Sequence, residues 1–492
     1  MEAIHLKTVD PVSQNLFQSA AKQGIQLLWE RYERLQPQDG FLRLGLSCPY
    51  GCMQGPCRID PFGRGAEQGL CGLDRDGMVA AFLLRLCLHG ALEVVSERGA
   101  KEIFSENSWP SALTRRFGKA LKHFGGKPLS LREIDQTALL LQRPSESAEV
   151  LVEQALRLGI LTLVLSERKT PSRKAEKRVD CQVGYGLLSE EKIFIGVAGH
   201  PAQKAIAFLV REISRGSSSP FRILSLGDWI RTKNGFLPFA CSSGEAELLL
   251  STGSIHLLLA GPKTDPSLTE LCRQMEIPVV MSEKMPQVKN ILALARHHFS
   301  THSQHNTISA PSFIGQSSVA MTIEELKPLL KKRSFKKVAL VGGSDSPQQP
   351  MGWLPVELTT ALLGRKFLVA GWGDAALWII KSGLASEDRE SRAIPLDERQ
   401  SPLLALKGLS DAGKIGDLKG ICFVGLKTCQ DLAVALGMAG LGLDVCVGSP
   451  LPLWGSEKVR NLLSERFAEM GGRMTHYDHP ANPEEILEWF LK

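Results

Sequence analysis

Residues 193–199 read Ile-Phe-Ile-Gly-Val-Ala-Gly, and residues 337–343 read Lys-Val-Ala-Leu-Val-Gly-Gly. Each contains a short apolar run that ends in glycine, as is typical of a strand buried on both faces of a parallel sheet. Further strands of this kind are expected at 221–226, 255–261, 277–281, 367–371, 420–425 and 443–448. Because helical sequence separates these runs, they predict βαβ units arranged as two Rossmann-like domains.

The amino-terminal third of the chain has a helical pattern instead. Apolar residues recur at helical spacing over 11–35 and 76–97, and again over 121–158 with a turn at 125–128. A basic stretch at 166–178 is expected to be an exposed connector. The predicted fold class is therefore α/β, with an amino-terminal helical domain followed by two Rossmann-like parallel-sheet domains. The expected domains are 1–180, which contains a cysteine-rich loop at 48–71, then 181–320 and 321–492.

The composition excludes several classes of protein. Of the 492 residues, 43% are hydrophobic and 22% are charged, which is typical of globular proteins. The net charge of +6 is too small to indicate nucleic-acid binding. No segment is expected to span a membrane, because the uncharged run at 432–443 is too short, and no secretory signal is visible. These features favour a cytoplasmic location.

Four of the 11 cysteines lie close together, at Cys48, Cys52, Cys57 and Cys71. Four thiolates are the ligand set of a 4Fe-4S cluster. The glycines and the proline between them favour tight turns, whose N–H groups can point toward cluster sulfurs. Zinc is the main alternative, although structural zinc usually binds paired CxxC motifs. Four buried structural cysteines would not explain the crowding, so we expect one 4Fe-4S cluster.

A second candidate site follows from the sheets. Ligands of doubly wound sheets bind beyond the carboxyl ends of the strands, where His200, Gly343, Asp374 and Cys429 are expected to surround one crevice. None of these loops contains GxGxxG, so a nucleotide is not indicated.

The cysteine loop resembles the amino-terminal cluster loop of the anaerobic nickel-iron carbon monoxide dehydrogenases, whose superfamily also contains the hybrid-cluster proteins. The similarity is carried by residues 46–60, by Gly-Leu-Cys-Gly at 69–72, by Gly-His-Pro at 199–201 and by Val-Gly-Gly at 341–343. It extends over essentially the whole chain, which is nonetheless shorter than a typical member, and it implies the same fold. In one departure from the family, three residues rather than two separate Cys48 and Cys52.

The resemblance also implies two further metal sites, and most of their ligands are missing here. Asp39 and Ser47 match the cysteines of an intersubunit cluster. In the family a nickel-iron-sulfur cluster is held by one histidine, matched by His200, and five cysteines, of which only Cys429 could be retained. Other residues occupy the remaining matched positions: Lys263, Gly343 and Asp374 replace cysteines, while Arg98 and Leu432 replace a histidine and a lysine that transfer protons.

A soft multi-iron cluster requires thiolate donors, so a nickel-iron-sulfur cluster is not expected. His200 and Cys429 are interpreted as remnants of that site. Together with Asp374 they could at most hold a single iron or zinc ion, which is the least favoured of the metal hypotheses.

These observations favour a carbon monoxide dehydrogenase-like protein that keeps one 4Fe-4S electron-transfer cluster and acts as an electron-relay or scaffold subunit of a redox complex. The expected partner is an iron-sulfur or flavin protein that docks on a basic face. The sequence does not decide whether the chain also forms a homodimer. Two alternatives remain. One is an active carbon monoxide dehydrogenase or hydroxylamine-reducing hybrid-cluster enzyme that uses other cysteines, namely Cys87, Cys181, Cys241, Cys272, Cys422 and Cys446. The other is a zinc-binding structural interaction protein. No catalytic residue is assigned.

Overall fold

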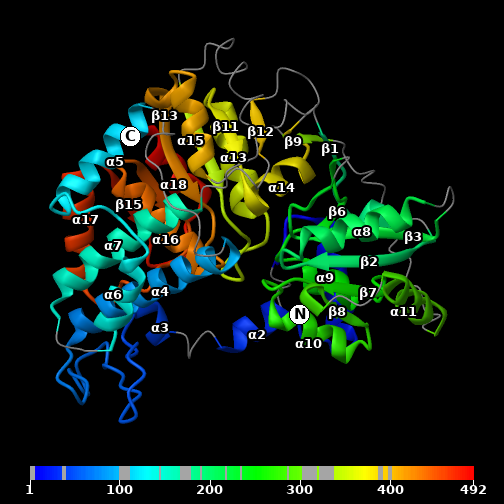
Figure 1. The fold of residues 1–492 in the computed structure, drawn as a ribbon, viewed down its shortest axis with the longest axis horizontal. Coiled ribbons are helices and arrows are strands. Elements are labelled where there is room, and N and C mark those ends of the chain that lie inside the picture. Colours follow the sequence, from blue (N-terminus) through cyan, green and yellow to red (C-terminus); the bar gives the residue numbers. More distant parts are fainter. Residues whose placement is uncertain are drawn as a thin grey trace.

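The computed structural model describes residues 6–35, 40–98, 111–142, 146–166, 179–188, 191–215, 219–232, 235–284, 288–301, 318–320, 337–385, 392–396 and 402–492. Two parallel sheets lie in different parts of the molecule, and a group of long helices packs beside the larger sheet (Figure 1). The predicted α/β fold class is confirmed. All of the proposed connector at 166–178 except its first residue lies outside the described residues.

The first sheet has five parallel strands in the order β6-β3-β2-β7-β8. Its strands are β2 (Ile193–Ala198), β3 (Phe221–Leu226), β6 (Phe239–Cys241), β7 (Leu257–Ala260) and β8 (Val279–Met281). The helices between and after them are α8 (Gln203–Ile213), α9 (Ala246–Ser251), α10 (Pro266–Gln274) and α11 (Val288–Thr301). Counted along the chain the strand order is 3-2-1-4-5, so the winding reverses between β2 and β7, where a ligand crevice is expected.

The second sheet has six parallel strands in the order β12-β11-β10-β13-β14-β15. Its strands are β10 (Val338–Gly342), β11 (Leu368–Gly371), β12 (Ala393–Pro395), β13 (Leu418–Phe423), β14 (Asp444–Val447) and β15 (Arg473–His476). Its helices are α13 (Trp353–Gly364), α14 (Gly373–Lys381), α15 (Pro402–Asp411), α16 (Cys429–Gly440), α17 (Glu457–Met470) and α18 (Pro483–Leu491). The order 3-2-1-4-5-6 is that of dinucleotide-binding folds, with the winding reversed between β10 and β13.

All eight strands predicted from apolar runs are present, whereas β6, β12 and β15 were missed. These three lie at sheet edges. The edge strand β15 is partly exposed and carries polar residues, so no continuous apolar run marks it. The strands β6 and β12 are buried, but each is only three residues long and forms too short an apolar run to stand out. Two small antiparallel pairs were also missed: β1 (Val179–Cys181) with β9 (Ser318–Ala320), and β4 (Arg231–Thr232) with β5 (Gly235–Phe236).

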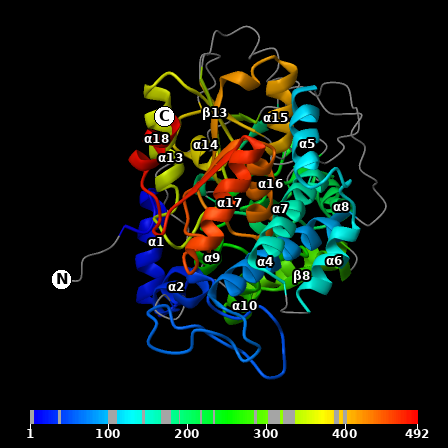
Figure 2. The same ribbon diagram turned by 90° about the vertical axis from the view of Figure 1, so that its left-hand side faces the viewer.

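The amino-terminal part is helical, as expected. Its helices are α1 (Pro11–Lys22), α2 (Leu28–Leu35), α3 (Gly40–Leu44), α4 (Arg75–Arg98), α5 (Ser111–His123), α6 (Arg132–Leu140) and α7 (Ala148–Leu165). In Figure 2, α4, α6 and α7 lie together with α16 and α17 of the second sheet's half. The helices α1 and α2 instead share an apolar core with the first sheet, through Phe17, Leu27 and Leu224 among others. The three-domain division therefore stays a prediction. The apolar cores do not follow it, because residues of different proposed domains pack in the same core.

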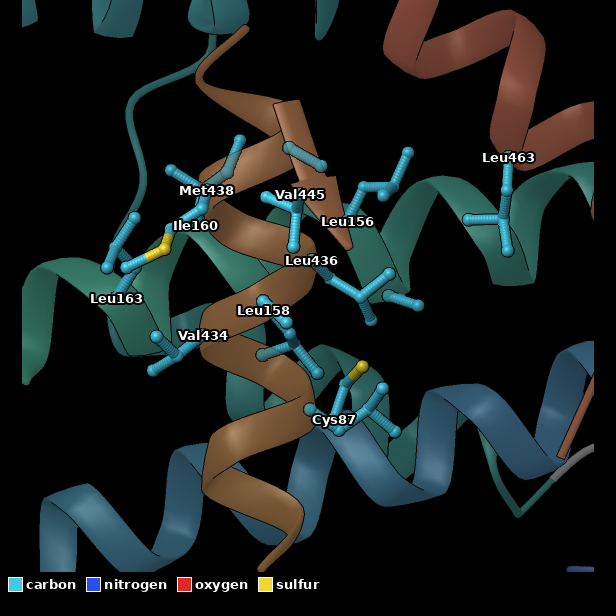
Figure 3. Close-up of a cluster of buried hydrophobic side chains, with 14 of the residues drawn as sticks. Cys87, Leu156, Leu158, Ile160, Leu163, Val434, Leu436, Met438, Val445 and Leu463 are labelled. Atoms are coloured by element: carbon cyan, nitrogen blue, oxygen red, sulfur yellow. The ribbon is translucent and has the colours of Figure 1, made fainter. Parts of the chain in front are cut away.

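Helices α4, α7 and α16 cross one another closely in the largest apolar core (Figure 3). A Cβ at Gly437 would lie 2.3 Å from the carbonyl oxygen of Gly159, and one at Gly90 would lie 2.5 Å from that of Cys429. Only glycine permits these backbone approaches. Leucine, isoleucine and methionine side chains fill the space around the crossing of α7 and α16.

One of the described helices is long and apolar enough to cross a membrane by length and composition, namely residues 75–96 of α4. The helical pattern over 76–97 predicted this helix, but only 432–443 was considered as a possible membrane span. In the structure 61% of the apolar window is buried inside the protein. A buried core helix has the same composition, so α4 is weak evidence for a membrane span.

Candidate metal sites in the cysteine loop and at the strand ends

The loop that carries Cys48, Cys52, Cys57 and Cys71 lies between α3 and α4 and protrudes from the helical part (Figure 2). Two arginines of α4 hold it in place. Arg85 donates to the Pro49 carbonyl at 2.6 Å, and Arg75 donates to the carbonyls of Asp60 and Pro61 at 3.1 and 3.2 Å. The loop is thereby attached to a helix that is itself part of the core.

Backbone hydrogen bonds bring the cysteines of this loop together. The Cys48 N–H donates to the Cys57 carbonyl at 2.9 Å, within a short antiparallel bridge between Ser47 and Arg58. Glycines lie against the sulfurs: a Cβ built on Gly55 would lie 3.5 Å from Cys52 Sγ, and one on Gly69 would lie 3.6 Å from Cys57 Sγ. The tight turns predicted from the glycines are therefore present, with backbone close to the sulfurs.

The four thiols are near enough to influence one another electrostatically. Burial raises the pKa of Cys48, and the charges of Cys57, Cys52 and Cys71 raise that pKa further. Burial likewise raises the pKa of Tyr50 to about 12, with contributions from Cys48 and Cys71. Thiolates that repel one another are stabilised together when they bind cationic iron.

Cys48 and Cys57 are half-buried, whereas Cys52 and Cys71 are exposed, and all four are free thiols. Over the part of the chain that is described, no group of three or more His, Cys, Asp or Glu side chains is placed to hold one metal ion. A single zinc ion bound at about 2.3 Å needs sulfurs within about 4 Å of one another, whereas a 4Fe-4S cluster binds one thiolate at each of four irons. The donor set, four thiols in one loop, fits an iron-sulfur cluster chemically.

The second candidate site lies at the carboxyl ends of the strands. His200 follows β2 and has a left-handed backbone, with φ of 53°, as does Gly199 with φ of 73°. The N–H groups of these two residues converge on one point. Here the Asp228 carboxylate occupies that point, accepting hydrogen bonds from both N–H groups, and its Oδ1 lies 3.8 Å from His200 Nε2. His200 is therefore paired with a residue that follows β3, the strand next to β2 in the same sheet.

Cys429 is the first residue of α16 and lies against α4, beside Gly90. Burial raises the pKa of this thiol to about 11, and the negative charges of Glu93 and Asp431 act in the same direction. In the absence of a metal ion this thiol is therefore protonated at neutral pH.

Asp374, at the start of α14, is buried, and its carboxylate is fully engaged in hydrogen bonds. It accepts from the Ser243 N–H at 3.0 Å, from the Ser243 hydroxyl at 2.5 Å and from the Asp345 N–H at 2.9 Å. A role as a metal ligand would require breaking these bonds. The sequence analysis missed Asp345 and the two serines Ser242 and Ser243, because no motif marks residues that a fold brings together from separate loops.

The structure thus places His200 and Gly343 in loops that follow β2 and β10, and Asp374 and Cys429 in the first turns of α14 and α16, which follow β11 and β13. It does not join His200, Asp374 and Cys429 into one ligand set, since each side chain has other neighbours. Lys263, expected at a lost ligand position, donates to Gln430 at 3.1 Å instead. Asp39 lies outside the described residues, and the side chains of Arg98 and Cys181 are not described.

Comparison with known proteins identifies the group to which this architecture belongs. No protein-family model matches the chain. Carbon monoxide dehydrogenase 1 from Methanosarcina mazei is 49% identical over 85 residues, which make up 17% of this chain and 13% of that protein. The structure of carbon monoxide dehydrogenase IV from Carboxydothermus hydrogenoformans is similar with a TM-score of 0.74 and 19% identity, over 99% of this chain and 98% of that one. The chain is therefore similar in sequence to carbon monoxide dehydrogenases over 85 residues, and it has the fold of these enzymes.

A second solved structure is similar with a TM-score of 0.73 and 16% identity, over 100% of this chain and 94% of that one. It is an acetyl-CoA synthase/carbon monoxide dehydrogenase with NiZn[Fe4S4] and NiNi[Fe4S4] clusters. The structural likeness establishes the carbon monoxide dehydrogenase fold for this chain. The sequence match covers only 13% of the length of the Methanosarcina mazei protein, so the similarity does not assign that protein's activity to this chain.

The strand-end residues of this chain do not fit a nickel-iron-sulfur cluster. The positions matched to cysteines carry an amine at Lys263, no side chain at Gly343 and a hydrogen-bonded carboxylate at Asp374. Gly343 also leaves no room, because a Cβ there would lie 2.5 Å from the Gly425 carbonyl oxygen.

Proposed function

We propose that this chain is an iron-sulfur electron-relay subunit that holds one 4Fe-4S cluster on Cys48, Cys52, Cys57 and Cys71 and has lost carbon monoxide oxidation. The observation that carries the proposal is the contrast between the two candidate sites. Four free thiols are gathered in a loop anchored by Arg75 and Arg85, whereas the strand ends present hydrogen-bonded groups in place of thiolates.

The loop would suit electron exchange with another protein because part of it is exposed. Cys52 and Cys71 lie at the surface, and three apolar neighbours are also exposed, namely Met53, Phe62 and Leu70 at 100%, 78% and 74%. Exposed apolar groups beside a redox centre are typical of a protein contact. Arg64 lies over the Phe62 ring at 5.9 Å and adds positive charge to this surface. The partner we propose is an iron-sulfur or flavin protein with an acidic docking face.

The test is anaerobic purification of the full chain, followed by analysis of iron, sulfide, nickel and zinc and by electron paramagnetic resonance of the reduced protein. We expect about four iron and four sulfide per chain. Cys57→Ala should lose most of the iron. Cys272→Ala, which removes a buried thiol of the first Rossmann-like domain, should retain it and serves as the matched control.

The same analysis separates the alternatives. Zinc without iron would overturn the proposal in favour of a structural interaction protein. Stoichiometric nickel, together with viologen reduction that depends on carbon monoxide, would overturn it in favour of an active carbon monoxide dehydrogenase. Reduction of hydroxylamine by protein that contains a second iron cluster would indicate a hybrid-cluster type of enzyme.

A further inference from the structure

Two serines of the first Rossmann-like domain donate hydrogen bonds to two aspartates of the second. Ser242 Oγ donates to Asp345 Oδ2 at 2.5 Å. Ser243 donates to Asp374 through its N–H at 3.0 Å and through its hydroxyl at 2.5 Å. The Asp345 N–H joins the two pairs by donating to Asp374 at 2.9 Å. These four residues are called the interdomain lock below.

The loops that carry the interdomain lock are in close contact. A Cβ on Gly244 would lie 2.8 Å from Asp345 Cβ, so the turn after Ser243 fits against the second domain only as glycine. The indole N–H of Trp378 donates to both carboxyl oxygens of Asp345, at 2.9 and 3.0 Å. Trp229 makes a further contact between the domains, donating to the Gly373 carbonyl at 3.2 Å.

A buried ion pair extends the interdomain lock to the amino-terminal helix. Lys381 Nζ lies 2.5 Å from Asp10 Oδ2 and 2.7 Å from Glu245 Oε1. Burial opposes the charge of Lys381, but Glu245 and Asp10 together raise its pKa. Glu245 also accepts from the Ser242 N–H at 3.0 Å. The cation therefore links three parts of the chain and offsets the negative charge beside the lock.

We propose that the interdomain lock joins the two Rossmann-like domains without metal, at the place where the family resemblance puts a cluster with ligands from both domains. Asp345 follows β10 and Asp374 follows β11, at the carboxyl end of the second sheet. Hydroxyl and N–H donors of one domain meet carboxylates of the other, and this pairing replaces metal–thiolate bonds across the same boundary. Asp345 and Asp374 each accept three hydrogen bonds, which a metal ion would have to displace.

The test is hydrogen–deuterium exchange of the anaerobic full-length protein, with and without added nickel chloride. In Ser243→Ala the protection of residues 242–247 and of residues 343–346 should fall together, by about tenfold or more, since a hydrogen bond to a charged group is lost. Asp374→Ala should have a larger effect on the same two segments. The matched control is Glu270→Ala, which breaks an exposed ion pair with Arg273 inside α10 and should leave both segments unchanged.

Nickel should neither bind stoichiometrically nor change the exchange of the wild-type protein. The inference is overturned if nickel binds stoichiometrically and increases protection of both segments, and if His200→Ala abolishes that effect. It is also overturned if Ser243→Ala lowers the protection of residues 242–247 but leaves that of residues 343–346 unchanged. The inference shares with the proposed function the premise that no nickel cluster forms at the strand ends, but it does not need the cysteine loop. Iron analysis of the same samples separates the two: loss of iron in Cys57→Ala with an unchanged lock would leave this inference standing.

Discussion

Replacing Asp345 by asparagine should remove a pH dependence from the stability of this protein. Burial and the neighbouring Asp374 carboxylate raise the pKa of Asp345 from its usual 3.8 to about 7. The charges that act on the lock are the acids Asp374 and Glu245 together with Lys427, whose charge lowers the pKa of Asp374. The folded protein therefore holds a proton on Asp345 that the unfolded chain releases at about pH 4.

The sign follows from this difference in bound protons. A group whose pKa is raised by folding contributes stability below its unfolded pKa, and that contribution is lost as pH rises through the folded pKa. Between pH 4 and pH 7 the free energy of unfolding of the wild-type protein should fall by about 3 kcal/mol relative to Asp345→Asn. This figure follows from about 1.4 kcal/mol for each unit of pH over which the two states differ by one bound proton. Asparagine keeps an oxygen for Ser242 and Trp378, whereas Asp345→Ala removes that acceptor and should cost about 1–3 kcal/mol at every pH.

The assay is urea unfolding of wild type and variant at several pH values, compared as a difference between the two proteins. The difference is needed because burial lowers the pKa of His476 to about 4, and this histidine destabilises the fold as pH falls from 6.5 toward 4. That contribution is common to both proteins and cancels. Parallel curves for wild type and Asp345→Asn from pH 4 to pH 7 would refute the reasoning, because the carboxyl would then titrate alike in both states.

Two further substitutions test separate parts of the molecule. Gly244→Ala should destabilise the protein by about 1–3 kcal/mol in thermal unfolding, since its Cβ would lie 2.8 Å from Asp345 Cβ, whereas Gly364→Ala, with open space around it, should change stability by less than about 1 kcal/mol. Equal effects of the two alanines would show that the loop relaxes freely. Arg64→Glu should slow electron transfer to an acidic ferredoxin by about tenfold at low ionic strength and little at high salt, while Lys22→Glu on α1 should not. A loss that is independent of salt would place the contact elsewhere.

Much of the fold could be predicted from the sequence because its central strands are buried on both faces. Runs such as Ile193–Ala198 and Val338–Gly342 are apolar throughout, and their burial is complete. The edge strand Arg473–His476 carries polar residues on partly exposed positions, so no apolar run marks it. The sequence also did not show which helices share a core. Helix α16 follows β13 in the chain, yet it packs chiefly on α7 and α4. Periodicity shows that a helix has an apolar face, but not which neighbour covers it.

The two candidate sites differed in predictability for a similar reason. The cysteine loop is local in sequence, so spacing alone indicated that its thiols gather. The interdomain lock is assembled from loops about 100 residues apart, since Ser242 and Asp345 are separated by 103 positions. Serine and aspartate are common in loops, and nothing in their local sequence distinguishes these residues from other turn residues. The sequence indicated that thiolates were missing at the strand ends, but not what had replaced them.

The architecture can persist without a metal cluster at the strand ends because its helices are held by backbone and apolar contacts. Gly90 of α4 lies against the Cys429 carbonyl at the start of α16, and Gly159 of α7 meets Gly437 of the same helix. None of these approaches involves a metal-binding side chain. At its other end α4 holds the cysteine loop through Arg75, whose guanidinium also donates to the Gly455 carbonyl at 3.2 Å. A cluster in that loop would therefore be fixed to the core through α4, whether or not the strand ends carry metal, and the proposed relay function would need no second metal centre to support the fold.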